Sequence, residues 1–455
     1  MKSMKDMKVV KEHFPCIARF WDETRWSVLI DERIQEKKSG KGFLTGITLN
    51  VFMIGLVSFL TDASSEIIYP LMPAFLALAS VGHGVAPALL IGILEGFAET
   101  ASALLKLAGG IWTDRVRRKK PLILAGYGIS SVFRPLVGLA TAWWQPVVLR
   151  VIDRVGKGIR TAPRDALIAE STPKEYCGKA YGFHRSMDHL GAVVGPLLAV
   201  ALIFFLSGRG TMGQERLLRT VFLLAAVPGA LCLAVLIFWI KDVNATPAGK
   251  SFHLTWRAFN PNFRLYLTSL LVFTLGNSTD MFLILRAAEV IKGAGGGLAQ
   301  GRWALAMVPL LWAFFHVFKS ASTAPLGALS DRIGRKSLIG LGWGVYALVY
   351  LGFALMNRPW QAWPLFDVYA LYYGLTEGVE KAFIVDLAPA ELRGTALGMY
   401  NFVIGIAALP ASLLFGYVYV RAGALTAFGY AALLAVFAVA LLSLKVRENP
   451  GPARA

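Results

Sequence analysis

Long apolar stretches recur along the chain and are separated only by short polar connections. A helix needs about 20 apolar residues to cross the hydrocarbon of a bilayer. Because an unpaired backbone group is costly in lipid, each of these stretches is expected to be helical. The sequence therefore predicts an all-α membrane protein with twelve transmembrane helices, near 43–79, 86–112, 121–143, 146–168, 181–206, 217–240, 263–291, 303–326, 337–356, 363–387, 395–420 and 425–444.

The charges distinguish this chain from soluble and nucleic-acid-binding proteins. Only 16% of its residues are charged, whereas soluble domains have about 25%. The mean hydropathy is +0.57. The net charge of +18 does not indicate nucleic acid as a partner, because Lys and Arg gather in connections between apolar stretches, at 114–120, 241–264 and 331–336.

The loop charges also predict the orientation in the membrane. The connection at 80–85 has no Lys or Arg, and cytoplasmic loops carry the excess of these residues. Both termini of this multi-pass protein are therefore expected on the cytoplasmic side of the inner (plasma) membrane. Residues 1–42 lack the apolar segment and cleavage site of a signal peptide, so we interpret them as a cytoplasmic extension.

An internal repeat divides the chain into two parts. The pattern Gly-x-x-x-Asp-Arg at 110–115 recurs at 327–332, Pro-x-Glu-x-x-Gly at 173–178 recurs at 389–394, and Thr-Asp at 61–62 recurs at 279–280. These pairs share roughly one offset, which is the signature of a duplicated unit. The predicted parts are an extension at 1–42, a first six-helix half at 43–240, a cytoplasmic linker at 241–262, a second six-helix half at 263–446 and a cytoplasmic tail at 447–455.

The repeated loop segment resembles a motif of the major facilitator superfamily, Gly-x-x-x-Asp-Arg-x-Gly-Arg-Arg. The copy at 327–336 matches better than the copy at 110–119, which has Arg117 where the family has Gly. The resemblance implies a secondary transporter, a monomer in the lipid bilayer, that moves a small molecule by alternating access. Its motif residues are expected to form a conformational latch, although they could instead only set topology; they are Gly110, Asp114, Arg115, Arg118, Gly327, Asp331, Arg332 and Arg335.

A second resemblance concerns the direction of transport. Gly182, Gly191, Gly195 and Pro196 fit Gly-x8-Gly-x3-Gly-Pro, the pattern of helix 5 in antiporters of the superfamily, without its closing Gly-Gly. Arg-x-x-Lys-Gly at 154–158 is similar to the antiporter pattern Arg-x-x-Gln-Gly in helix 4. These segments imply proton-coupled export. The alternative is that small residues only allow the helices to pack closely.

Two carboxylates in the first apolar stretch are candidates for proton coupling. Asp62 and Glu66 lie one helical turn apart and therefore on the same face. Ionisable groups inside a membrane are costly, and they are functional candidates by default. We expect this pair to bind the transported proton or the substrate, and the alternative is a fixed ion pair that only locks helices together.

The fourth stretch carries a charged stripe. Its charged residues recur three or four positions apart, so they share one side of a helix; they are Arg150, Asp153, Arg154, Lys157, Arg160 and Arg164. Asp62, Glu66 and Asp153 are the expected counter-ions. In one interpretation the stripe relays protons. In the other it attracts an anionic cargo that bears a phosphate or carboxylate.

The second half has fewer charges inside its apolar stretches. Asp280 is the repeat partner of Asp62 and is expected to face the same cavity as Asp62. Further candidates for proton or substrate coupling are Arg286, Glu377 and Glu380. A pairing of Glu377 with Lys381, four residues later, is the alternative for that side chain.

The chain has no nucleotide-binding Gly-x-x-x-x-Gly-Lys-Ser/Thr segment. Its three Cys lie far apart and show no metal-ligand spacing. We therefore expect no cofactor, metal or enzymatic activity, and expect protons and a small molecule as partners. A membrane enzyme and a non-transporting receptor remain the alternatives from other classes.

Overall fold

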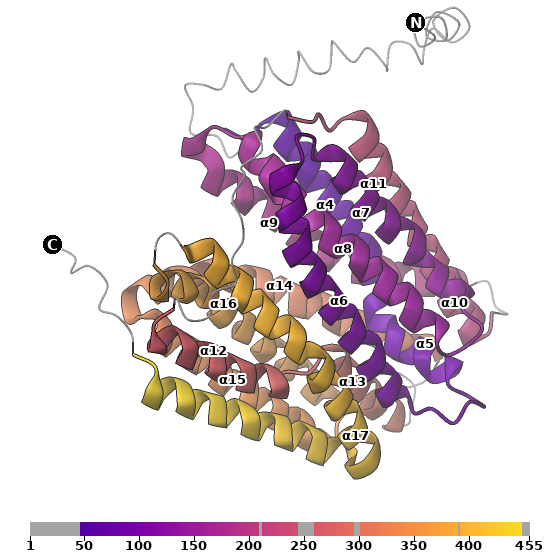
Figure 1. Ribbon diagram of the computed structural model, residues 1–455. Helices are drawn as coiled ribbons and strands as arrows, with labels where there is room; N and C mark the ends of the chain where they lie inside the picture. The colour runs from indigo at the N-terminus through magenta and orange to yellow at the C-terminus, as the bar shows by residue number, and fades with distance from the viewer. Residues whose placement is uncertain (1–45, 209–211, 244–258, 295–300, 390–391, 448–455) are drawn as a thin grey trace, which may run out of the picture.

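The computed structural model describes residues 46–208, 212–243, 259–294, 301–389 and 392–447 (Figure 1). Most of the predicted linker and nearly all of both terminal segments lie outside these ranges. The first half consists of α4 (Leu49–Ile68), η2 (Tyr69–Leu71), α5 (Met72–Ala79), α6 (Pro87–Arg115), α7 (Lys120–Phe133), η3 (Pro135–Leu139), α8 (Gln145–Glu170), η4 (Lys174–Tyr176), α9 (Cys177–Ser207), α10 (Gln214–Leu224) and α11 (Ala226–Phe238).

The second half is also entirely helical within the described ranges. Figure 1 shows it in orange to yellow beside the indigo and magenta helices of the first half. Its elements are α12 (Pro261–Gly276), α13 (Met281–Gly293), α14 (Gly301–Ile333), α15 (Arg335–Leu355), η7 (Pro359–Gln361), α16 (Ala362–Leu387) and α17 (Arg393–Lys445).

The helices account for the twelve predicted spans. Nine helices in the described part of the chain are long and apolar enough to cross a membrane. The last of these, α17, contains two spans because its backbone leaves the helical conformation at Gly423. The helices α8 and α16, with 26 residues each, are long enough but carry several ionisable side chains. The prediction of an all-α membrane protein is confirmed.

The first span of each half is interrupted, but at different positions. In the first half α4 gives way to η2 and α5, which carry Pro70 and Pro73 in their first turns. Proline cannot donate the helical hydrogen bond, so it bends or ends a helix. In the second half the interruption lies between α12 and α13, at residues 277–280.

Hydrogen bonds at the ends of the spans show which helix ends lie together. The amide of Asn50, at the start of α4, donates to Ser171 Oγ at 2.7 Å, and the backbone N–H of Lys241 donates to Asn50 Oδ1. At the start of α12, Asn262 Oδ1 accepts from the backbone N–H of Arg447. We call this end of the bundle, which also holds the α6–α7 and α14–α15 connections, the motif end, and the opposite end the far end.

The hydrophobic core of the described residues consists of two clusters of unequal size. One large cluster contains buried residues of both halves, including Ile67 and Phe75 of the first and Phe282 and Trp312 of the second. A smaller cluster near the motif end contains residues of the first half, such as Tyr127 and Leu236. The large cluster therefore joins the halves.

Two helices of different halves approach closely along one side of the contact between the halves. A Cβ on Gly92 of α6 would lie 2.5 Å from the carbonyl oxygen of Ser412 in α17, and a Cβ on Gly416 would lie 2.7 Å from that of Ala88. Glycine at these positions lets the two backbones touch.

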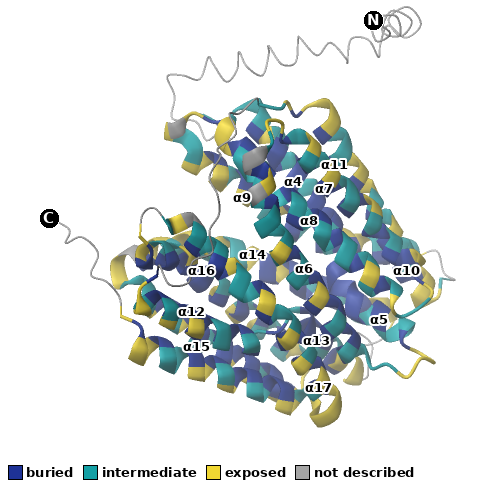
Figure 2. Cartoon of the chain, in the orientation of Figure 1, coloured by how far each residue is buried: buried dark blue, intermediate teal, exposed yellow. Residues whose placement is uncertain are grey.

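The outer surface is apolar, as lipid contact requires. Figure 2 shows exposed residues along the outer faces of the helices and buried residues inside the bundle. Large exposed side chains include Phe205, Leu348, Leu433 and Phe437, which are 62%, 68%, 71% and 54% exposed.

Candidate functional site

The two halves meet through polar contacts between α4–η2 and α14. The indole Nε1 of Trp312 donates to Glu66 Oε2 at 2.7 Å. The Tyr69 hydroxyl lies 3.3 Å from Thr279 Oγ1, and its ring lies 5.4 Å from the Trp312 ring. The carboxylate predicted in the first span therefore lies at the contact between the halves, which we call the seam.

Two of the predicted glycines in α9 hold the acid-bearing part of α4 in place. A Cβ on Gly191 would lie 2.4 Å from the carbonyl oxygen of Phe59 and 3.1 Å from Asp62 Cβ. A Cβ on Gly195 would lie 2.7 Å from Glu66 Cβ. Each glycine thus lies directly against one of the two acids.

The remaining members of that glycine pattern behave differently. Gly182 is exposed, and a Cβ there would have no atom within 4 Å. Pro196 lies inside α9, which continues to Ser207. Close packing in the antiporter-like pattern is thus limited to its central glycines.

Asp62 is half-buried and has no ion-pair partner within 4.0 Å in the described part of the chain. It interacts electrostatically with Asp188 of α9 and with Lys157 and Arg160 of α8. Bases of α8 therefore attract Asp62 electrostatically, although none of the described ones forms an ion pair with it.

The stripe on α8 finds its counter-ions mainly on α6. Arg150 Nε donates to Glu95 Oε1 at 2.9 Å, and Arg154 Nε lies 3.2 Å from Glu99 Oε1. Asp62 and Glu66, the counter-ions expected from the sequence, make no ion pair with the stripe within 4.0 Å among the described residues, although its bases attract them electrostatically. The reason is that α6 packs along α8 more extensively than α4 does, which places the carboxylates of α6 next to the bases.

Asp153 behaves as predicted, and it also has a partner from outside the stripe. Arg134 Nη2 lies 2.9 Å from Asp153 Oδ1, and Arg150 Nη1 lies 3.5 Å from Oδ2. All three side chains are nearly inaccessible, with at most 5% exposed. Because a buried ion is stable only when it is well paired, this cluster fixes helices α7 and α8 to each other.

Lys157 of the predicted stripe has no close carboxylate among the described residues. It is half-buried, and no ion pair within 4.0 Å is found for it among the described residues. Further along α8, Arg160 lies over the Tyr127 ring at 4.3 Å and donates to Ser130 Oγ.

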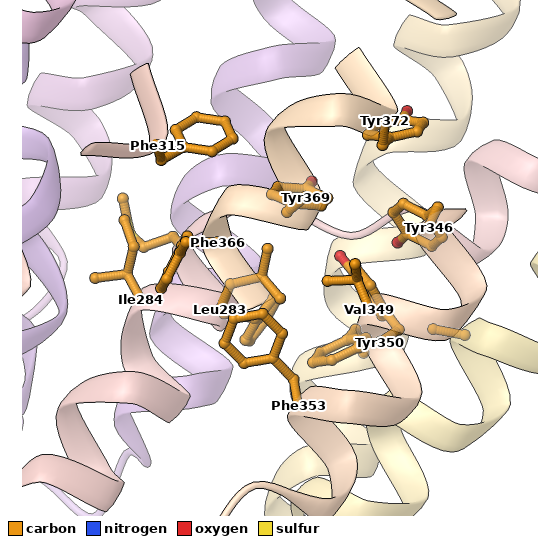
Figure 3. Packing of buried hydrophobic residues seen from close by; sticks show 14 of the residues in the cluster. Leu283, Ile284, Phe315, Tyr346, Val349, Tyr350, Phe353, Phe366, Tyr369 and Tyr372 are labelled. Atoms are coloured by element: carbon orange, nitrogen blue, oxygen red, sulfur yellow. The ribbon is translucent and has the colours of Figure 1, made fainter. Parts of the chain in front are cut away.

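Asp280, at the start of α13, accepts hydrogen bonds from two tyrosines of α16. Tyr369 Oη donates to Asp280 Oδ1 at 2.6 Å, and Tyr373 Oη lies 3.0 Å and 2.9 Å from its two oxygens. A helix N-terminus also favours negative charge. Figure 3 shows Tyr369 beside the rings of Tyr346 and Tyr372.

Glu377 connects the two halves near the motif end. It contacts the guanidinium of Arg185 on α9, and its Oε2 lies 3.5 Å from Lys319 Nζ. Lys319 in turn lies 3.7 Å from the centre of the Tyr373 ring. Glu377 therefore pairs with Arg185 and Lys319 rather than with Lys381.

Two predicted site residues lie away from the seam. Glu380 is buried within the second half, where Trp343 Nε1 and Tyr400 Oη donate to it at 2.9 Å and 2.7 Å. Arg286 donates to the carbonyl oxygen of Met356 at 2.5 Å. It lies more than one turn beyond Asp280 towards the far end, where its Nη1 is 3.9 Å from Glu289 Oε2.

Sequence reasoning missed His316 of α14. Its Nε2 lies 3.8 Å from Glu66 Oε2, and the side chain is 10% exposed. Neither ring nitrogen has a hydrogen-bond partner among the described residues. A single His in an apolar stretch is a weak signal, and its neighbour Glu66 is 250 positions away in the chain, so only the fold brings them together.

The predicted latch is described only in part. Cβ atoms on Gly110 and Gly327 would have no neighbour within 4 Å, and Arg118 and Arg332 are exposed. Arg335 contacts Asp386 and the carbonyl oxygen of Ala382, both in the second half. The side chains that lie outside the described residues are Asp114, Arg115 and Asp331, and the latch stays a prediction.

Cavities lie at both ends of the seam. Near the motif end, a cavity of about 400 Å³ lies between α9 and α14 and is lined by Arg185, Ser186, His189, Ser320 and Thr323, among others. At the far end, cavities of about 330 Å³ and 380 Å³ flank the contact between α5 and α13.

Comparison with known proteins places this architecture in a family. The sequence model of the Major Facilitator Superfamily matches residues 54–409 and 303–455. An uncharacterized MFS-type transporter of Methanocaldococcus jannaschii is 36% identical over 400 residues, which are 87% of this chain and 94% of that relative. Multidrug resistance protein MdtG of Proteus mirabilis is 24% identical over 349 residues, covering 75% of this chain and 82% of MdtG.

A solved structure shares the fold at low sequence identity. It is a bacterial homolog of the human lysosomal transporter Spinster, in an inward-facing and unoccupied conformation. The TM-score is 0.65 at 15% identity, over 90% of this chain and 96% of that one. Since the family match also spans most of the sequence, this chain belongs to the Major Facilitator Superfamily of membrane transporters.

Proposed function

We propose that the protein exports a small molecule in exchange for protons by alternating access. In this proposal it is a monomer in the inner membrane, with both termini in the cytoplasm. The observation that carries the proposal is the hydrogen bond from Trp312 of one half to the Glu66 carboxylate of the other. The similarity to a multidrug resistance protein and the antiporter-like glycines of α9 support export.

The charge state of Glu66 bears directly on the contact between the halves. A hydrogen bond to a carboxylate is roughly twice as strong as one between neutral groups. Protonation of Glu66 therefore weakens its bond to Trp312, so the contact between α4 and α14 depends on whether the proton is present. Such a change biases a two-state equilibrium between opening at one end and at the other.

Asp62 extends the same site by one turn. It faces Lys157, which has no close ion-pair partner among the described residues, so both charges can respond to an arriving proton or cargo. Binding of either one changes the field at the other, which gives exchange when proton and cargo cannot be bound together.

The test is flux in proteoliposomes with an imposed pH gradient, using a cargo first found by screening. Glu66→Gln or Asp62→Asn should abolish pH-driven flux and leave cargo exchange without a gradient measurable. Glu215→Gln changes a carboxylate that is 59% exposed on α10 and should behave like the unmodified protein. Full pH-driven transport in both seam variants would contradict the proton role.

Transport of an anionic cargo is the second candidate function. Lys157 supports this candidate because it has no close carboxylate among the described residues and could bind an anion instead. The candidate is weakened by Glu95, Glu99 and Asp153, which neutralise other bases of the stripe. Under this alternative, Arg154→Ala should destroy binding of an acidic cargo, while Glu66→Gln should keep the full dependence on the pH gradient.

A further inference from the structure

His316 lies in α14 one turn after Trp312, on the side that meets the first half. Its ring is perpendicular to the Trp312 ring, with centres 4.9 Å apart. The imidazole is buried, and within the described chain neither nitrogen has a hydrogen-bond partner. An unpartnered buried polar group is costly, so its presence needs a physical explanation.

The neighbouring carboxylate supplies that explanation. Glu66 Oε2 accepts from Trp312 and lies 3.8 Å from His316 Nε2, slightly beyond hydrogen-bond length. A side-chain movement of about 1 Å would bring the two atoms to the usual distance of about 2.8 Å for a charge-assisted bond. A proton is the ligand that both atoms can share.

We propose that Glu66 and His316 hold one transported proton between them across the seam. This inference rests on the proposed proton exchange and names the second group of that site. In the transfer, the O–H bond of Glu66 breaks and an N–H bond forms on His316, so a neutral pair becomes a carboxylate and an imidazolium. The total charge of the pair stays at zero, and it becomes negative when the proton leaves.

The surrounding charges control how readily the pair of Glu66 and His316 binds and releases the proton. Bases on α8 stabilise the Glu66 carboxylate, whereas Lys319 repels positive charge on His316. The titratable and charged groups around the pair are Asp62 on α4, Arg150, Arg154 and Lys157 on α8, Asp188 and His189 on α9, Asp280 at the start of α13, Lys319 on α14 and Glu377 on α16.

The pair is formed by different halves, so it exists only while the seam is closed at this level. Separation of α4 from α14 divides the proton-holding site and leaves the proton on one partner. His316 thereby makes proton release depend on the conformational change, which a carboxylate alone would not do.

The test compares His316→Gln with the unmodified chain in proteoliposomes across a range of pH. When two groups shift each other's pKa by more than about one unit, they release their protons in two macroscopic steps. We therefore expect the variant to show a single step in its pH–flux profile, shifted by about one unit or more. Cargo exchange without a pH gradient should persist, which shows that the variant is folded and binds cargo.

Matched variants separate the possible results. His83→Gln removes an exposed imidazole whose Nδ1 lies 3.1 Å from the carbonyl oxygen of Val81, and it should leave the profile unchanged. If His316→Gln does not fold, His316→Asn carries the same test. A His316 variant with an unchanged profile overturns the shared proton, even when Glu66→Gln abolishes pH-driven flux. Unchanged pH-driven flux in Glu66→Gln overturns the proposed function itself.

Discussion

Two tyrosine hydroxyls on one face of α16 hold the carboxylate of Asp280, and their effects should not add. Tyr369→Phe alone should cost about 0.6 kcal/mol of stability, the average for a hydrogen bond between membrane helices. The double variant with Tyr373→Phe leaves a buried carboxylate without these donors and should cost roughly 1–3 kcal/mol more. Thermal unfolding in detergent measures both.

A matched control for the tyrosine variants is Tyr266→Phe. Tyr266 is fully buried, and its hydroxyl has no hydrogen-bond partner in the described part of the chain. Loss of this hydroxyl should leave the unfolding temperature unchanged or raise it, because a buried polar group without a partner is unfavourable. Equal, additive losses at Tyr369 and Tyr373 would contradict a shared role in holding Asp280.

The packing of α9 against the acids gives a second prediction for single residues. The Cβ introduced by Gly195→Ala would lie 2.6 Å from the carbonyl oxygen of Ala63, which belongs to the α4 backbone and cannot rotate away. Overpacking of this kind costs about 1–3 kcal/mol. We expect a lower unfolding temperature together with reduced pH-driven flux, because Glu66 must move.

Gly182→Ala on the same helix is the control, because its new Cβ would have no neighbour within 4 Å. It should be neutral or slightly stabilising, since Ala favours a helix by about 0.5–1 kcal/mol over Gly. Identical stability and flux in the two variants would show that α4 and α9 are not in close contact at Gly195.

The sequence could identify the candidate acids but not most of their partners. Asp62 and Glu66 stand out because charges within an apolar stretch are rare. The contacts of Glu66 with Trp312 and His316, and of Arg150 with Glu95, depend on which helices become neighbours. Spacing along one helix contains no information about that.

Among the elements, α17 shows how one residue separates two spans. The sequence predicts spans near 395–420 and 425–444, and Gly423 lies in the interval with φ of 81° and ψ of 172°. This conformation is accessible almost only to glycine, and it costs other residues about 1–3 kcal/mol of conformational free energy. Gly423→Ala should therefore lower the unfolding temperature.

The control for this backbone effect is Gly429→Ala in the same helix. A Cβ would have open space within 4 Å at both positions, so crowding cannot explain a difference. Gly429 is helical and should tolerate alanine or gain slightly from it. An unfolding temperature for Gly423→Ala equal to that of Gly429→Ala would contradict the strained turn.

The interruption between α12 and α13 was not predictable from hydropathy. The sequence analysis treats 263–291 as one span, because four polar residues at 277–280 interrupt a long apolar stretch only briefly. In the structure the helix ends there, and the hydroxyl of Tyr346 on α15 donates to the carbonyl oxygen of Gly276 at 2.9 Å. Such a partner from another helix is what makes a break inside a membrane tolerable.

At the scale of the whole molecule, the ion pair between Arg185 and Glu377 should affect conformation more than stability. Arg185 is 49% exposed, and exposed ion pairs contribute about 0–1 kcal/mol. That is too little to change unfolding noticeably. It can nevertheless shift the ratio of two nearly balanced conformations by up to about fivefold.

Arg185→Gln should therefore increase the rate at which a thiol reagent labels Ser320→Cys, which lines the cavity between α9 and α14. The increase should be at most about fivefold, with the unfolding temperature nearly unchanged. Glu215→Gln breaks an exposed ion pair within α10 and should leave labelling as it was. Equal labelling in all three proteins would mean that the pair does not hold the halves together.

The duplicated Thr-Asp sequence has acquired different surroundings in the two halves. In the second half, Asp280 is bound by two tyrosines, whereas in the first half Asp62 has no close counter-ion among the described residues. The two copies are thus free to diverge under separate selection. In the proposed exchange, we therefore expect substitutions in the tyrosine-rich face of α16 to change which cargo is accepted, and substitutions of Asp62 to change the coupling to protons.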